Sequence, residues 1–184
     1  MIFLDNMEKC YLCSKDAKIK QQNNRFICDR CFNKQFEKRI RKFARVNKVF
    51  KKNDKILVMG EVNKFLVSKI VKDLPMKVYF KKGSNVDKVL LQWTIDDEAN
   101  DFLLNLFKSK ARKKFFKKDI KFLITMTNDD VEEFARINKI KFNSEKIDPF
   151  IKKLIDDLHK EHPSAKYTLV KNISVLNRLT IKVK

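Results

Sequence analysis

Glycine and proline are scarce in this chain, with two and three residues respectively among 184. Flexible linkers and low-complexity segments are rich in such residues, so the composition argues against both. Hydrophobic residues make up 43% of the chain and include sixteen Phe, which is enough apolar surface for a core. We therefore expect one ordinary folded domain with a small appendage.

Long apolar runs are also missing. No stretch approaches the roughly 20 apolar residues that a membrane-spanning helix requires. The opening residues, Met1–Asp5, have no basic start and no small-residue cleavage site, which argues against a secretory signal. These absences predict a cytoplasmic protein without a membrane partner.

Acidic residues are few, because 23 Asp and Glu stand against 43 Lys and Arg and leave a formal charge of +20. A field of this sign favours polyanionic partners such as RNA, DNA or an acidic protein. A solvated, lysine-rich surface is the alternative. Charge alone does not choose between them.

All four cysteines fall in one unit, as two Cys-x-x-Cys pairs that are fourteen residues apart: Cys10, Cys13, Cys28 and Cys31. Two such turns present four thiolates, which is the closed tetrahedral set that Zn²⁺ prefers and which leaves no open position for catalysis. The spacing therefore predicts a structural zinc ion. Two disulfides, free thiols or an iron–sulfur cluster are the alternatives, and reducing conditions disfavour the disulfides.

Four basic residues surround these pairs, namely Lys9, Lys15, Arg25 and Arg30. Nearby positive charge stabilises a thiolate, so we expect these residues to lower the thiol pKa values. Lower pKa values favour metal binding, because the metal binds the deprotonated form.

An amphipathic helix is predicted directly after the second pair. Phe32, Phe36, Ile40 and Phe43 recur at steps of three and four residues, so they form one apolar face that we expect to pack on the domain. The remaining positions are basic, and this face is either solvated or in contact with phosphates. The candidate RNA-binding residues here are Lys34, Lys38, Arg39, Arg41, Lys42 and Arg45.

Strand and helix patterns alternate through the rest of the chain, which predicts an α/β sheet. The predicted strands are Lys55–Met59, Lys77–Phe80, Val89–Trp93 and Phe122–Ile124. Helical spacing follows the first strand through Phe65, Leu66, Ile70 and Leu74, and a further helix is expected near residues 130–138.

Two more helices carry N-terminal signals. Thr94 precedes Asp96, Asp97 and Glu98, three acids that suit a helix N-terminus, and the helix is expected to bury Ala99, Phe102, Leu103, Leu106 and Phe107. Asp148-Pro149 predicts a second start, with Phe150, Leu154, Ile155 and Leu158 buried. His159 and His162 lie near its C-terminus, where cations suit the helix dipole, so we do not expect them to bind metal.

The segment from Lys108 to Lys121 carries eight basic residues together with Phe115 and Phe116. It is the densest positive stretch of the chain, and it either contacts a polyanion or forms a solvated loop. Its candidate RNA-binding residues are Lys110, Arg112, Lys113, Lys114, Lys117 and Lys118.

Four segments in this order resemble the tRNA thiouridylase family of PP-loop adenine nucleotide α-hydrolases. They are the knuckle and basic helix from Cys28, the Lys55–Val58 strand, Ile95–Leu106 and Leu158–Tyr167. The resemblance implies a truncated PP-loop parallel sheet with flanking helices and an N-terminal zinc ribbon or knuckle. The expected parts are a four-cysteine zinc knuckle at 1–33, a basic helix and linker at 34–52, and a degenerate, shortened α/β domain at 53–184.

The ATP loop of that family reads Ser-Gly-Gly-Lys-Asp-Ser. Here the matching positions are Glu61, Val62, Asn63, Lys64, Phe65 and Leu66. Glycines let backbone amides approach a pyrophosphate, so we expect Val62 and Asn63 to block that approach and the Glu61 carboxylate to repel the phosphates. The departure predicts that ATP does not bind.

Active family members also use cysteines in the catalytic domain, to hold an iron–sulfur cluster or to carry sulfur, one of them just before a Pro-aromatic pair. Here Asp148 precedes Pro149-Phe150, so no iron–sulfur cluster is expected. The chain resembles a shortened archaeal form of the degenerate second subunit of the wobble-uridine thiolase.

This resemblance implies a non-catalytic subunit that binds tRNA and a catalytic thiouridylase paralogue as a heterodimer, with a homodimer as the fallback. A stand-alone zinc-containing RNA-binding protein, or an active tRNA thiolase with an altered ATP site, remain as alternatives.

Overall fold

A computed structural model describes residues 8–181 apart from 22–23, 72–73, 82–84 and 163, and it describes the backbone alone at 159 and 176–181. The expectation about Met1–Asp5 lies outside the described residues. The strands are β1 Ile19–Lys20, β2 Phe26–Ile27, β3 Lys55–Val58, β4 Lys77–Tyr79, β5 Lys88–Thr94 and β6 Asp119–Leu123. The helices are α1 Asp29–Val46, α2 Glu61–Ile70, α3 Ile95–Lys108, α4 Asn128–Asn138, α5 Pro149–Glu161 and α6 Ala165–Ile181.

The main sheet is parallel and has the strand order β4-β3-β5-β6. Its central strands are short apolar runs, as expected for strands with covered faces. All four predicted strands are present, so the predicted α/β class is confirmed. The largest difference is in β6, which begins at Asp119 because Val89 and Leu90 of β5 pair with Asp119 and Ile120. Lys121, predicted to belong to the basic segment, therefore lies in this strand.

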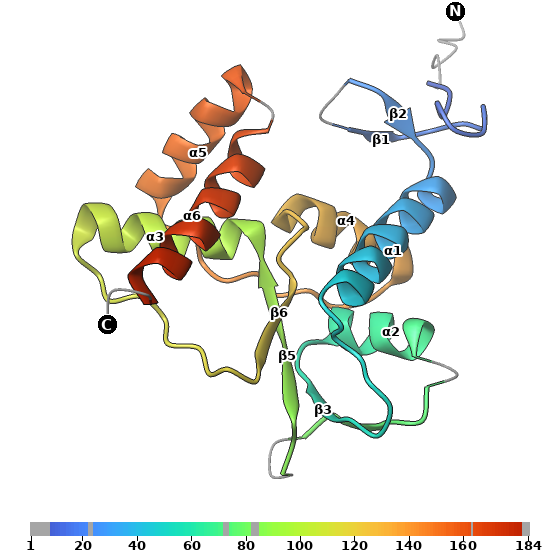
Figure 1. Ribbon diagram of the computed structural model, residues 1–184. Helices are drawn as coiled ribbons and strands as arrows, with labels where there is room; N and C mark the ends of the chain where they lie inside the picture. The colour runs from blue at the N-terminus through green and yellow to red at the C-terminus, as the bar shows by residue number, and fades with distance from the viewer. Residues whose placement is uncertain (1–7, 22–23, 72–73, 82–84, 163, 182–184) are drawn as a thin grey trace, which may run out of the picture.

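Helices α1, α2 and α4 lie on one side of the sheet (Figure 1). Three residues of the apolar face predicted for α1 are buried, namely Phe32, Phe36 and Ile40, and Phe43 is partly buried. The rings of Phe36 and Phe134 of α4 stack with centroids 4.1 Å apart. Phe122 of β6 is fully buried in the same cluster. One continuous core thus joins the helix that follows the cysteines to the sheet.

Helices α3, α5 and α6 form a separate group on the other side (Figure 1). Their contact is a second apolar cluster that includes Ile95, Leu103, Ile151, Ile155 and Ile173. Helix α6 was not predicted, although Val170 and Ile173 supply a buried stripe at helical spacing. This helix is needed to complete the second cluster.

Four side chains predicted to be buried in this group are exposed. Leu106 and Phe107 are 61% and 54% exposed at the end of α3, and Phe150 and Leu158 are 53% and 44% exposed on α5. The reason is geometric: α3 runs past the core in its last turn, and α5 turns Ile151 inward in place of Phe150.

Among the described helices, none is long and apolar enough to cross a membrane.

Candidate metal centre and nucleic-acid interface

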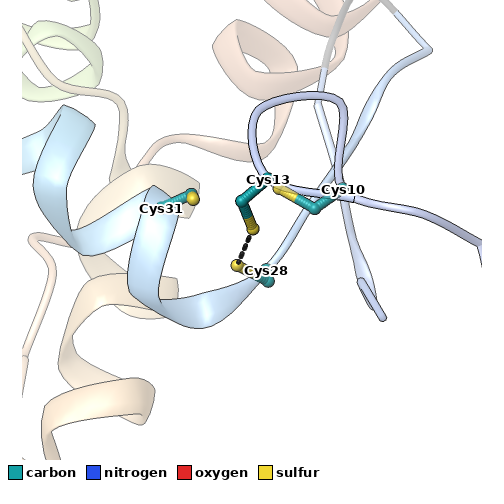
Figure 2. A group of neighbouring side chains, drawn as sticks. All are labelled: Cys10, Cys13, Cys28 and Cys31. Atoms are coloured by element: carbon teal, nitrogen blue, oxygen red, sulfur yellow. Dashed lines mark hydrogen bonds between the residues drawn. The ribbon is translucent and has the colours of Figure 1, made fainter. Parts of the chain in front are cut away.

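The four cysteines meet at the start of α1 (Figure 2). Cys10 and Cys13 lie on a turn before β1, Cys28 is the N-cap of α1, and Cys31 lies in its first turn. The hairpin β1–β2 brings the two pairs together through the pairing of Ile19 with Ile27. The predicted cysteine cluster is therefore confirmed as a group that can hold a metal ion.

The sulfur positions suit one ion. All four Sγ atoms lie within 4.8 Å of one another, and those of Cys13 and Cys28 are 3.6 Å apart. A tetrahedral zinc with Zn–S bonds of about 2.3 Å places sulfur pairs about 3.8 Å apart. The described cysteines are all free thiols, so this geometry fits metal ligation and not a disulfide pairing.

The environment shifts two of the thiol pKa values in opposite directions. Burial raises the pKa of Cys10, but backbone N–H groups of Cys28, Leu12 and Cys13 outweigh this and lower it to about 6. Burial and the neighbouring cysteine sulfurs raise the pKa of Cys31 to about 12. Bound metal favours the thiolate form of all four.

The basic residues near the cluster are not the main cause of the lowered pKa of Cys10, in contrast to our expectation. Lys9 pairs with Asp16 at 2.6 Å, and the Arg25 guanidinium lies 5.5 Å from the Tyr11 ring centroid. These side chains are turned toward partners of their own. Backbone N–H groups, which no sequence pattern of charges reports, lower the pKa instead.

The predicted ATP loop forms the turn from β3 into α2 and the first turns of that helix. Lys64, the residue that matches the family motif, donates to Glu61 at 2.6 Å, and its Nζ lies 5.8 Å from the Phe80 ring centroid. Phe65 packs edge-on against Phe134, and Leu66 is fully buried. Each of these side chains therefore has a structural role within the domain.

Val62 and Asn63 are both fully buried, and the Asn63 amide donates to the carbonyl of Met59 at 2.9 Å. The side chain that covers the turn is Gln92 of β5. Gly60 adopts φ +85°, and a Cβ atom added to it would overlap Gln92 Oε1 and lie 2.6 Å from Gln92 Cδ. Gln92 thus occupies the space directly beside the backbone of the turn, and sequence analysis missed it because β5 is distant in the chain.

The second strand-to-helix turn at this edge, from β5 into α3, holds three buried acids. Only Asp97 caps its own helix, by accepting from the backbone N–H and hydroxyl of Thr94. Asp96 accepts from the N–H of Asn128 at 2.6 Å and pairs with Lys166 of α6 at 2.8 Å. All three acids lie in the first turn of α3 as expected, but only Asp97 forms a capping box, and Asp96 also joins α3 to α4 and α6.

Glu98 makes three contacts away from its own helix. It accepts from Trp93 Nε1 at 2.8 Å and from Arg112 at 2.9 Å, and it pairs with Lys121.

Burial raises the pKa of Asp97, although the hydrogen bonds from Thr94 oppose this. Burial lowers the pKa of Lys166, but the Asp96 carboxylate outweighs it and the pKa is raised, so the Lys166 ammonium stays protonated.

Two clefts border the N-terminal part of α4. One of about 450 Å³ opens beside Asp96, Asn128 and Lys166. The other, of about 830 Å³, runs between the cysteine unit and α4 and is lined in part by Lys18, Arg39, Asp130 and Tyr167. Both mix acids with bases, and neither is lined by a cysteine.

The structure divides the predicted RNA-binding residues into two groups. Four are engaged: Arg39 with Asp130, Thr125 and Tyr167, Arg41 with Glu37, Arg112 with Glu98 and Asp101, and Lys113 with Glu145. The others are exposed, and no described residue forms an ion pair with them. These are Lys34, Lys38, Lys42, Arg45, Lys110, Lys114, Lys117 and Lys118.

His162 is exposed at the C-cap of α5, and the side chain of His159 lies outside the described residues. Within the described part of the chain, the cysteines form the metal-ligand cluster, and no histidine joins it.

Comparisons with known proteins complete the description. No protein-family model matches the sequence, and no curated protein matches it either. A solved structure with the same fold is the U34-tRNA thiolase NcsA from Methanococcus maripaludis with its [4Fe-4S] cluster. The similarity has a TM-score of 0.71 at 18% sequence identity, and it covers 93% of this chain and 87% of that chain. The chain therefore has the parallel α/β fold seen in that thiolase, joined to a four-cysteine cluster that can bind a metal ion.

Proposed function

We propose that this chain is a non-catalytic subunit of a tRNA 2-thiouridine synthesis complex that acts on the wobble uridine. The observation that carries the proposal is the β3–α2 turn, where Gln92 covers Gly60 and Glu61 neutralises Lys64, in a fold similar to that of a U34-tRNA thiolase. In parallel α/β sheets, ligands bind at the carboxyl ends of the strands where the strand order reverses, which here is between β3 and β5. In this chain, the side chains of Gln92 and Glu61 occupy the position at which such a ligand would bind.

The location of the thiols supports a non-catalytic role. The chain has four cysteines, all in the N-terminal cluster, and residues 32–184 contain none. The α/β domain therefore has no thiolate that could carry sulfur or ligate a cluster at the edge of the sheet. Sulfur transfer would fall to a catalytic paralogue that binds ATP, while the present chain contributes RNA contacts.

We assign zinc to the cysteine cluster, since sulfurs this close together suit a single ion, whereas a four-iron cluster spreads its ligands over separate metals. When bound, the metal would hold Cys10, Cys13, Cys28 and Cys31 as thiolates and so fix the hairpin to α1. Elemental analysis of protein purified without air should find one zinc per chain and no visible absorption band. Iron with such a band would contradict the assignment.

The eight exposed, unengaged basic residues are the proposed tRNA contacts. Phosphate contacts release counterions, so the logarithm of the tRNA affinity should fall linearly with the logarithm of the salt concentration. Replacing Lys34, Lys38 and Lys42 with Gln should lower both the affinity and this slope. The matched control is Arg41→Gln, because the Glu37 carboxylate already engages that guanidinium.

Reconstitution tests the proposal as a whole. A catalytic thiouridylase paralogue is expressed with and without this chain, and the assembly and the 2-thiouridine content of tRNA are measured by light scattering and mass spectrometry. We expect a heterodimer, and thiolation that requires both chains. Thiolation by this chain alone would identify an active enzyme instead. Tight tRNA binding with no association to a folded paralogue would identify a stand-alone RNA-binding protein or a homodimer.

A further inference from the structure

The connection between α3 and β6, residues 109–118, contains six basic residues and no acid. It leads from the end of α3 to the start of β6 at Asp119, and on the way Arg112 contacts Glu98 in the first turn of α3. Two adjacent phenylalanines, Phe115 and Phe116, lie within it. We call residues 109–118 the basic loop.

The two phenylalanines have opposite environments. Phe115 packs edge-on against Trp93 with centroids 5.0 Å apart, and Lys121 Nζ lies 4.1 Å from its ring centroid. Phe116 is 73% exposed, the highest value among the large hydrophobic side chains of the described residues. Phe115 therefore anchors the basic loop on the sheet, and the ring of Phe116 is presented to solvent.

The backbone holds Phe116 in place. Its N–H donates to Asp119 Oδ2, and its carbonyl accepts from the Asp119 N–H, both at 2.9 Å. The carbonyl of Lys118 accepts from the N–H of Val89 in β5, also at 2.9 Å. An exposed ring on a turn fixed to a sheet is a prearranged surface for stacking.

The basic residues of this loop also fall into two groups with different environments. Arg112 pairs with Glu98 and Asp101, and Lys113 forms an exposed ion pair with Glu145. The lysines beside Phe116, namely Lys114, Lys117 and Lys118, are exposed, and no ion-pair partner for them is found among the described residues. An aromatic face bordered by such lysines suits a base and its flanking phosphates.

We infer that Phe116 stacks on an unpaired base of single-stranded RNA while Lys114, Lys117 and Lys118 contact the adjacent phosphates. The inference rests on the proposed function, from which it takes the RNA partner, and it names the part of the RNA that the basic loop recognises. A protein partner suits this surface less well, because protein interfaces are depleted in lysine.

The test uses the full zinc-loaded chain and two labelled RNAs in fluorescence anisotropy: an unstructured strand of about ten nucleotides and a duplex of the same sequence. Phe116→Ala should weaken binding of the single strand about 5- to 100-fold, since a stacked base contributes on that scale. Binding of the duplex should not change, because its bases are already stacked. Phe116→Trp should restore binding of the single strand.

Phe107→Ala is the matched control, since it removes an exposed ring of α3 that packs on Phe150 of α5 and is not part of the basic loop. Equal affinity of Phe116→Ala and the wild type for the single strand would overturn the inference. So would a loss that Phe107→Ala shares, or a loss of paralogue association with RNA affinity intact, which would assign the ring to a protein interface. Stacking can fail in this assay while the paralogue still assembles and thiolation proceeds, so the two failures are distinguishable.

Discussion

Two strand-to-helix turns lie at the same edge of the sheet and have opposite chemistry. The turn from β3 into α2 is filled by neutral amides, with Asn63 beneath it and Gln92 above it, and each has a buried oxygen for which no partner is found among the described atoms. The turn from β5 into α3 buries three carboxylates. Asp96 pairs with Lys166, and Glu98 pairs with Arg112 and accepts from Trp93. Asp97 accepts from Thr94 through Oδ2, while no partner for its Oδ1 is found among the described atoms.

This difference shows at which of the two turns charged side chains have a structural role. Buried charges are tolerated only when they are paired and hydrogen-bonded, so the α3 turn behaves as a link between α3, α4, α6 and the basic loop. The α2 turn has two neutral amide side chains, those of Asn63 and Gln92, at the place where an anion would bind. Its remaining lysine is neutralised by Glu61. If this comparison is correct, changes at the α3 turn should lower stability, and changes at the α2 turn should report on packing.

The largest effect is expected for Asp96→Ala. The substitution leaves the Lys166 ammonium and the Asn128 N–H buried without their acceptor, which should lower the free energy of unfolding by about 3–5 kcal/mol. Urea denaturation followed by circular dichroism measures it.

Asp157→Ala is the control, because its pair with Lys160 is exposed and should contribute at most about 1 kcal/mol. Equal effects of the two substitutions would mean that the α3 turn is not a structural link.

A smaller loss is expected for Gly60→Ala. The positive φ of Gly60 strains any other residue, and the added methyl group would overlap the Gln92 side chain, so we expect about 1–3 kcal/mol. In a Gln92→Ala background the loss should shrink, giving a coupling energy of about 0.5 kcal/mol or more in a double-mutant cycle. Additive effects would show that Gln92 does not fill the turn.

The smallest effect concerns pH. The pKa of Asp97 is raised by burial above the ordinary value of 3.8, so the folded chain holds this proton more tightly than the unfolded chain. The stability of the wild type relative to Asp97→Asn should therefore rise as the pH falls from the raised pKa toward 3.8.

Asp148→Asn provides the opposite case, because the hydrogen bond from Lys108 lowers the pKa of Asp148. The contribution of the Asp148 carboxylate to the stability of the wild type is present at a pH above the pKa of Asp148 in the unfolded chain. It should be lost as the pH falls through the pKa of Asp148 in the folded chain. Equal slopes for the two variants in urea denaturation at several pH values would contradict the assignment of Asp97 as a carboxyl disfavoured by burial.

Much of the fold follows from the sequence because it depends on local periodicity. The apolar stripe of α1, the four β-rich runs and the Asp148-Pro149 start each carry their signal within a few residues. The cysteine cluster is equally local, since two Cys-x-x-Cys turns need only a hairpin to meet. Helix α6 was not predicted, although its apolar residues have helical spacing. Apolar side chains at the end of α3 and on α5 were assigned to the core, because periodicity does not show how far the helix packed against them extends.

The partners of the charged and polar residues could not be predicted in this way. Lys166 meets Asp96 from 70 positions away, and Gln92 covers Gly60 from the next strand in the sheet. Such contacts depend on strand order and on helix placement, which no local pattern specifies. The same is true of the basic residues, where Arg112 turns inward and Lys114 outward although they are two positions apart.

The central claim is that the edge of the sheet between β3 and β5 does not bind ATP. Titration calorimetry of the full zinc-loaded chain with Mg·ATP tests it most directly, with a catalytic paralogue as the positive control. We predict no saturable heat for this chain under conditions in which the paralogue binds. One-to-one binding that is lost in Lys64→Ala would contradict the account, because it would restore the nucleotide site that Gln92 and Glu61 are argued to have closed.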